Sequence, residues 1–105
     1  TYEQKHFGDD EKRGRLRLIA SPDGRDRSVS IHQDARVFAG LFDGAESARH
    51  ALEGSRKGYV HVARGSVVVN GRDLTGGDAL KSDGGPIVIE RGARAEVLVF
   101  DLPGD

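Results

Sequence analysis

Apolar side chains recur along the chain in short runs, and each run ends at a glycine, aspartate, asparagine or serine. Some runs alternate with polar residues and others are apolar throughout, a pattern typical of antiparallel strands, and no helical period extends beyond about two turns. Short strands with frequent turns favour a closed or two-layered architecture, because it avoids exposed edges. We expect a small all-β barrel or sandwich with strands at residues 15–20, 28–33, 36–41, 48–52, 59–64, 66–70, 79–81, 86–90 and 95–101.

Glycine-containing turns separate these runs and support the strand prediction. The chain has 15 glycines and only 3 prolines. Glycine follows a residue that tolerates positive φ, as hairpin and tight-loop geometry requires, at Asp23-Gly24, Asp43-Gly44, Asn70-Gly71 and Asp83-Gly84-Gly85. The strongest hairpin prediction joins residues 67–69 to residues 72–74 through Asn70-Gly71.

Residues 1–14 are polar and precede the strand pattern. We expect this segment to be an arm that packs on the domain through Tyr2 and Phe7, with a short turn of helix over residues 8–12. The remaining length suffices for one domain with its own core and leaves no room for a second. The predicted organisation is therefore a single domain over residues 1–105, without an internal repeat or a linker.

Composition excludes several classes of partner. The 16 basic and 17 acidic residues are interspersed and give a net charge of -1, which argues against nucleic-acid binding, since the phosphate backbone requires a basic stripe. The apolar runs are far shorter than the roughly 20 residues of a membrane-spanning helix, and no charged-then-apolar leader opens the chain. The absence of cysteine is compatible with a reducing compartment. We expect neither membrane insertion nor targeting, and a cytoplasmic location.

The segment over residues 59–78 resembles the central hairpin of a cupin barrel. A strand ends at Gly65, a second strand runs to the Asn70-Gly71 turn, and the pair Gly77-Asp78 opens the next strand. We expect Gly65 and Gly77 to lie at sharp bends, where a Cβ atom would meet neighbouring backbone.

Four further segments narrow the resemblance, namely residues 2–5, 20–26, 31–35 and 100–103. Together they are similar to the C-terminal half of the pirin-like bicupins, a family that includes bacterial quercetin 2,3-dioxygenases. This resemblance implies a double-stranded β-helix, or jelly-roll, barrel that packs face to face against an N-terminal cupin domain of the same protein. One departure is Arg27, which stands where the family pattern has a glycine.

The family resemblance also implies where a metal would be bound. A catalytic cupin holds a divalent metal through a His-x-His pair, a glutamate and a later histidine, which leave coordination positions open for dioxygen and substrate. By family spacing these ligands fall on Leu52 and Gly54, or Ala51 and Glu53, then Gly58 and Val88, with an asparagine position at Gly92. Every ligand is replaced, and a slipped register recovers at most His50. We therefore expect no metal, cofactor or catalytic residue in this domain, and a divalent metal such as iron in the partner domain.

The remaining polar residues offer weaker alternatives. His32 and Asp34 lie two apart on an expected strand and would share a face, so with His61 they form an alternative metal site. Capping of a turn is the simpler interpretation of His32 and Asp34. A sheet surface or domain interface suits His61 better than a position lining a lumen. His50 is interpreted as an ordinary strand residue, and His6 belongs to the polar arm.

Other motifs point to structure rather than chemistry. No serine lies in a nucleophile-elbow context. The loop over residues 23–26 lacks the alternating oxygen ligands of a calcium loop and is interpreted as a turn. The glycine pairs at 76–77 and 84–85 precede no helix and predict no phosphate site.

These observations favour a metal-free structural cupin domain that supports a metal-bearing partner barrel with quercetin 2,3-dioxygenase-type activity. One alternative is a binding module without catalysis, which holds a small apolar ligand or, like some animal relatives of the family, acts through protein partners. The other is an enzyme that uses a non-standard site near His32, Asp34 and His61. If a partner barrel normally covers apolar surface, the isolated domain is expected to self-associate.

Overall fold

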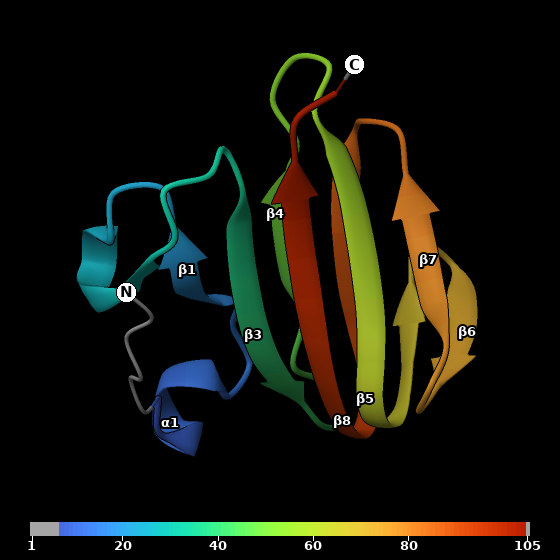
Figure 1. Ribbon diagram of the computed structural model, residues 1–105. Helices are drawn as coiled ribbons and strands as arrows, with labels where there is room; N and C mark the ends of the chain where they lie inside the picture. Colours follow the sequence, from blue (N-terminus) through green and yellow to red (C-terminus); the bar gives the residue numbers. More distant parts are fainter. Residues whose placement is uncertain (1–6, 105) are drawn as a thin grey trace.

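The computed structural model describes residues 7–104 and confirms the all-β prediction (Figure 1). Its short helical elements are α1 (Asp9–Lys12) and the 3-10 turn η1 (Arg25–Arg27). None of the helices in this described range is long and apolar enough to cross a membrane. The strands are β1 (Arg17–Ser21), β2 (Val29–Ser30), β3 (Arg36–Phe42), β4 (Ala48–Ala51), β5 (Lys57–Val69), β6 (Arg72–Thr75), β7 (Ala79–Ser82) and β8 (Pro86–Leu102).

Two long bent strands, β5 and β8, organise the molecule (Figure 1). They pair antiparallel with each other on both sides of their bends. One layer has the strand order β2-β1-β3-β8-β5-β7 and uses the C-terminal part of β8 with the N-terminal part of β5. The other layer has the order β4-β8-β5-β6 and uses the opposite parts of the same two strands. The bends of β5 and β8 therefore join both layers at one end of the barrel.

The bends correct the sequence prediction, which placed separate strands at 59–64 and 66–70 and at 86–90 and 95–101. The first pair is the single strand β5 and the second is β8, because the turning residues stay within the paired ladder. Gly65 has a φ of 73°, and Arg91 and Arg94 have φ values of 53° and 50°. A Cβ at Gly65 would lie 2.5 Å from the carbonyl oxygen of Ala93 and closer still to that of Arg94. The predicted close approach at Gly65 is confirmed.

Gly77 also favours glycine, but for a different reason from Gly65. Its φ is 96°, but an added Cβ would meet nothing within 4 Å. The prediction of crowding at Gly77 is wrong, and the left-handed backbone alone favours glycine there. The Asn70-Gly71 hairpin is confirmed, with φ values of 50° and 81° and β6 as its second strand.

The N-terminal third is less regular than predicted. The expected strand at 28–33 shrinks to β2, because His32 takes a left-handed φ of 54° and turns the chain. The predicted helical turn is present as α1. The guanidinium carbon Cζ of Arg17 lies 5.0 Å from the centroid of the Phe7 ring, so this part of the arm contacts β1. Tyr2 and His6 lie outside the described residues.

Arg27 occupies the position where a glycine was expected, and its backbone explains that expectation. Asp26 and Arg27 have φ values of 55° and 63°, in the region that glycine adopts without strain. The Arg27 side chain forms an ion pair with Glu11 of α1 at 2.7 Å. This contact links the η1 loop to the arm.

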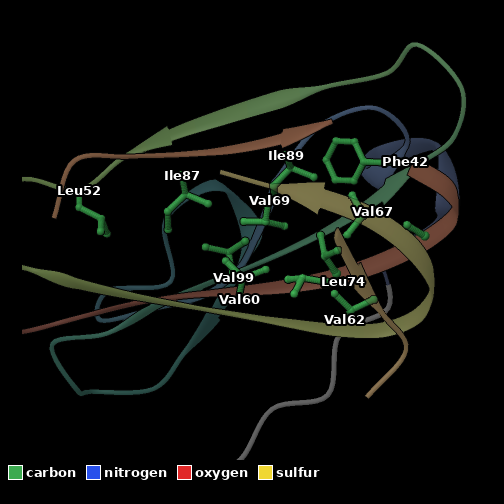
Figure 2. Close-up of a cluster of buried hydrophobic side chains, with 12 residues drawn as sticks. Phe42, Leu52, Val60, Val62, Val67, Val69, Leu74, Ile87, Ile89 and Val99 are labelled. Atoms are coloured by element: carbon green, nitrogen blue, oxygen red, sulfur yellow. The ribbon is translucent and has the colours of Figure 1, made fainter. Parts of the chain in front are cut away.

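Branched apolar side chains from both layers fill the space between them (Figure 2). Along β5 and β8 the buried positions alternate with half-exposed ones on each side of the bend, as a strand with one buried face requires. The core consists of Phe42, Leu52, Val60, Val62, Val67, Val69, Leu74, Ile87, Ile89, Ala95, Val97 and Val99.

Candidate functional site

A buried charged cluster closes one end of the barrel. The inward alternation of β8 continues beyond Val97 and Val99 to Asp101, whose side chain is only 4% exposed. Strand β4 brings His50 to the same end, and the turn after Leu52 brings Arg56. We call His50, Arg56 and Asp101, with the adjoining Asp34, the mouth cluster.

Hydrogen bonds connect every member of the mouth cluster. His50 Nε2 lies 2.8 Å from Asp101 Oδ2, and Arg56 Nε donates to Asp101 Oδ1 at 2.5 Å. Arg56 also donates to the Asp101 carbonyl at 3.0 Å and to the Asp34 carboxylate at 2.9 Å. The His50 ring lies against Phe38, with centroids 4.6 Å apart. The buried carboxylate therefore has partners on both of its oxygens.

Charge in the mouth cluster is fixed by Arg56. The hydrogen bond to Asp101, aided by the one to Asp34, raises the pKa of the Arg56 guanidinium further above its ordinary value. The Asp101 carboxylate is the deeply buried anion of the mouth cluster, whereas the Asp34 side chain is exposed. The guanidinium of Arg56, which is bonded to Asp101, balances its negative charge. A divalent metal placed there would be repelled by Arg56, so the cluster is suited to closing the barrel rather than to binding a cation.

The positions that family spacing assigns to metal ligands hold hydrocarbon or lack side chains. Leu52 is in the core, and a Cβ at Gly58 would lie 2.5 Å from Ile87 Cδ1 and 3.1 Å from Leu52 Cδ1. Val88 is half-buried between the inward-facing Ile87 and Ile89. A Cβ at Gly92 would lie 2.5 Å from the carbonyl oxygen of Phe42. The glutamate position thus has no room for a side chain.

In the other register the histidine pair falls on Ala51 and Glu53, which are exposed and therefore do not line the barrel interior. Gly54, from the first register, is exposed as well. Within residues 7–104, no three histidine, cysteine, aspartate or glutamate side chains gather to hold a metal. The described residues do not fit a cupin metal centre.

The alternative metal site at His32, Asp34 and His61 is not assembled. His32 is exposed on the loop after β2, and Asp34 is engaged by Arg56. His61 pairs with Ala79 of β7 and Leu98 of β8 on the outer face of the sheet. Position in a lumen is wrong for His61, because its neighbours Val60 and Val62 take the inward positions; the sheet-surface interpretation is confirmed.

Sequence reasoning overlooked His50 and Arg56. His50 does lie on a strand, but its ring faces inward to Asp101, so it is more than an ordinary strand residue. The alternation Ala95, Val97, Val99, Asp101 was the available signal, since a polar group at an inward position requires a partner. Nothing local indicates which residues supply that partner, because His50 and Arg56 are 51 and 45 residues away.

The loop over residues 23–26 is a turn, as predicted. Gly24 has a left-handed φ of 71°, and Arg25 forms an ion pair with Asp23 at 3.1 Å. This hydrogen-bonded pair lowers the pKa of Asp23 to about 2. Similarly, hydrogen bonding from Arg17 lowers the pKa of Glu11. Both carboxylates have surface partners and serve local structure.

Comparison with known proteins places this geometry in a family. A family model described as the quercetinase C-terminal cupin domain matches residues 18–102. The chain is 35% identical over 103 residues to quercetin 2,3-dioxygenase of Escherichia coli K12, which covers 97% of this chain and 43% of that protein.

Solved structures agree with the sequence match. YhhW from Escherichia coli superposes with a TM-score of 0.90 at 32% identity over 100% of this chain and 44% of that one. Bacterial pirin YhhW in complex with nickel(II) gives a TM-score of 0.89 at 33% identity, with the same coverage. Escherichia coli YhaK gives 0.74 at 29% identity over 84% of this chain and 41% of that one. The predicted cupin fold is thereby confirmed.

The chain spans less than half the length of these relatives. The family model covers most of this chain, and YhhW superposes over its whole length. The chain belongs to the quercetinase C-terminal cupin domain family of pirin-like proteins.

Proposed function

We propose that this chain is a cupin domain without a metal centre, which packs against a metal-bearing partner barrel in a quercetin 2,3-dioxygenase-type protein. The observation that carries the proposal is the filled glutamate position. Ile87 and Leu52 occupy the space that a side chain at Gly58 would need, so the barrel interior has a hydrocarbon lining where the family chemistry needs a carboxylate.

The mouth cluster supports a structural role. Asp101, buried among apolar neighbours, is neutralised by Arg56 and oriented by His50, which ties β4, β8 and the turn between β4 and β5 together. These bonds satisfy both oxygens of the Asp101 carboxylate and hold this end of the barrel together. Chemistry in the whole protein would then belong to the partner barrel, with a divalent metal such as iron as its cofactor.

The length of the relatives supports a partner domain. This chain corresponds to 44% of YhhW, whose structure includes a complex with nickel(II), so more than half of that protein lies outside the matched region. The family description as a C-terminal domain is consistent with a preceding barrel.

The outer face of the β3-β8-β5 layer offers a surface for such a partner. Tyr59, His61, Leu98 and Phe100 are half-buried there, and the Tyr59 and Phe100 rings pack edge to face at 6.0 Å. Leu102 at the end of β8 is 37% exposed. Covering these side chains would remove apolar area from water, so the isolated domain is expected to self-associate.

An apolar ligand inside the barrel is less well supported. The interior is filled by side chains such as Val60, Val69, Ile89 and Val99, all of them 0% exposed. Binding there would require displacement of the core.

Metal analysis tests the proposal directly. The chain is incubated with Fe(II) or Ni(II), desalted and analysed by inductively coupled plasma mass spectrometry, with full-length Escherichia coli quercetin 2,3-dioxygenase as the matched control. We expect metal to remain with the control and only traces with this chain. One metal ion per chain, lost on Asp101→Asn, would overturn the proposal.

A chimera tests the partner role. This chain replaces the matching region of the Escherichia coli enzyme, and metal content and quercetin-dependent oxygen consumption are measured. If the chimera retains metal and turnover, this domain can replace its 35% identical relative in a structural role. A soluble, metal-loaded chimera without turnover would contradict a purely structural role, because the domain would then contribute specific groups.

Light scattering of the isolated chain at increasing concentration tests self-association. A strictly monomeric chain would contradict that expectation.

A further inference from the structure

A charged cleft of about 220 Å³ lies at the barrel end opposite the mouth cluster. Helix α1, the turn after β3 and the bends of β5 and β8 surround it, and Phe42 and Ala95 form part of its floor. Ala95 and Asp101 lie six residues apart on β8, so about 20 Å of strand separates the two ends. The charged residues that line it are Asp9, Arg13, Asp43, Glu46, Arg64 and Arg94.

The acidic residues of the cleft are already engaged. Asp43 accepts a hydrogen bond from the Arg94 backbone N–H at 3.2 Å, and Glu46 accepts one from the Asp43 backbone N–H at 2.9 Å. Asp9 lies 4.0 Å from Lys12. These carboxylates fix the turn and the helix, and backbone N–H groups satisfy part of their hydrogen-bonding capacity.

The arginines of the cleft are less completely engaged. Arg64 donates to Glu96 at 2.9 Å. Arg13 and Arg94, by contrast, form no side-chain ion pair or hydrogen bond within residues 7–104. Each guanidinium presents a planar fork of N–H donors that matches carboxylate or phosphate oxygens. Arg13 and Arg94 are both exposed, so water solvates these two forks and they remain available to an acceptor that enters the cleft.

Arg94 has a backbone conformation that glycine would adopt more easily. At Gly65 on the bend of β5 and Gly92 on the bend of β8, a Cβ would collide with neighbouring backbone. Arg94 has a φ of 50°, which costs roughly 1 kcal/mol for a residue with a side chain, and glycine would avoid that cost. Arg91 shares this backbone conformation, so it is the place of Arg94 in the cleft lining that distinguishes the two arginines.

We propose that this cleft binds an oxyanion, a carboxylate or a phosphate group, through the guanidinium groups of Arg13 and Arg94. The oxyanion comes either from a free small molecule or from an acidic side chain of the partner barrel, and the chemistry of recognition is the same. The site is separate from the mouth cluster and does not depend on the absence of a metal centre.

The test is an NMR titration of the ¹⁵N-labelled chain with inorganic phosphate and with citrate, with sodium chloride adjusted to hold ionic strength constant. We expect saturable shifts of amides over residues 13–14, 42–46 and 92–95. Arg94→Asn keeps a residue that tolerates left-handed φ while it removes the charge, and Arg13→Gln removes the other fork. Each is expected to weaken binding about tenfold, the loss typical of a charge-assisted hydrogen bond.

Arg91→Asn is the matched control. Arg91 lies on the same bend with a φ of 53° but does not line the cleft, so its variant should bind like the parent chain. The absence of saturable shifts, or an equal loss in the Arg91 and Arg94 variants, would overturn the proposal, since either result leaves only non-specific screening.

The chimera distinguishes the two sources of the oxyanion. If an acidic side chain of the partner barrel fills the cleft, the chimera does not bind free phosphate or citrate, and Arg94→Asn lowers its melting temperature. If the ligand is a free molecule, the chimera binds it as the isolated chain does. The metal content of the Arg94→Asn chimera should equal that of the parent chimera, so failure of this inference is separable from failure of the proposed function.

Discussion

The two ends of this barrel use charge in different ways. At the mouth, Asp101 is buried and both of its oxygens are bonded, to His50 and to Arg56. At the bend, Arg13 and Arg94 line an open cleft and have no ion-pair partner among residues 7–104. A charge removed from water must be paired within the fold, whereas an exposed charge is solvated and remains available to a ligand.

The difference indicates where the chain holds structure and where it is available for recognition. Substitutions at the mouth should reduce folding stability. Substitution of Arg13 or Arg94 should leave stability unchanged or raise it while it reduces oxyanion binding. Only the glycines of the bend, which allow β5 and β8 to turn, should be as sensitive as the mouth.

The largest effect is expected for Gly65→Ala. The new Cβ would meet the carbonyl groups of Ala93 and Arg94, and the left-handed φ would be strained as well. Together these terms should lower the free energy of unfolding by about 4 kcal/mol, measured by urea denaturation. Gly77→Ala is the control, since its φ is also positive but the space is open, and it should cost only about 1 kcal/mol. Equal losses would refute the role of the collision.

At the mouth, Arg56→Met should destabilise the chain by about 3 kcal/mol, because it leaves the buried Asp101 carboxylate without its cation. The same denaturation experiment measures it. Adding Asp101→Leu should restore part of the lost stability, because no unpaired charge then remains. A loss below about 0.5 kcal/mol, the value typical of a surface ion pair, would show that the cluster behaves as an exposed one.

At the bend, Arg94→Gly should raise the free energy of unfolding by about 0.5 to 1 kcal/mol, because glycine adopts the left-handed backbone without strain. Arg91→Gly should produce a similar gain. The two variants differ in function, since only the Arg94 variant should lose oxyanion binding. A less stable Arg94→Gly protein would mean that the Arg94 side chain stabilises the fold. The mouth cluster and the cleft would then no longer differ in their roles.

The smallest effect concerns pH at the exposed Asp23–Arg25 pair. The folded pKa of Asp23 is about 2, below its ordinary value of 3.8. The contribution of this group to stability is therefore present above about pH 4 and is lost as pH falls through 2. Because both side chains are 56% exposed, the change in stability should be slight. Carboxyl-carbon NMR should give a midpoint near 2 that rises in Arg25→Ala, and an unchanged midpoint would contradict the assigned cause.

Local patterns predicted the outer and inner faces of the central strands well. The alternation around Val60 and Val62 put His61 on the sheet surface, and Asn70-Gly71 set the hairpin into β6. Strand boundaries were predicted less well at the bends, because the turning residues stay within the paired ladder of β5 and β8. A pattern that relies on glycine to mark turns therefore placed a break within β8.

The candidate sites also differ in how far the sequence could predict them. The positions assigned to metal ligands by family spacing, among them Gly58 and Val88, could be identified from the sequence, because such spacing is counted along the chain. The mouth cluster could not, since Asp101 obtains its partners from residues about half the chain length away. The arginine cleft likewise joins α1, β3, β5 and β8 at one end of the barrel.

What the amino-acid sequence alone decided is which residues face inward and where glycine allows the chain to turn, because side-chain alternation and the conformational freedom of glycine are local properties. What only the tertiary structure decided is which charges are paired. Pairing depends on distances between strands remote in the chain, and those distances exist only once β5 and β8 have bent and closed the barrel.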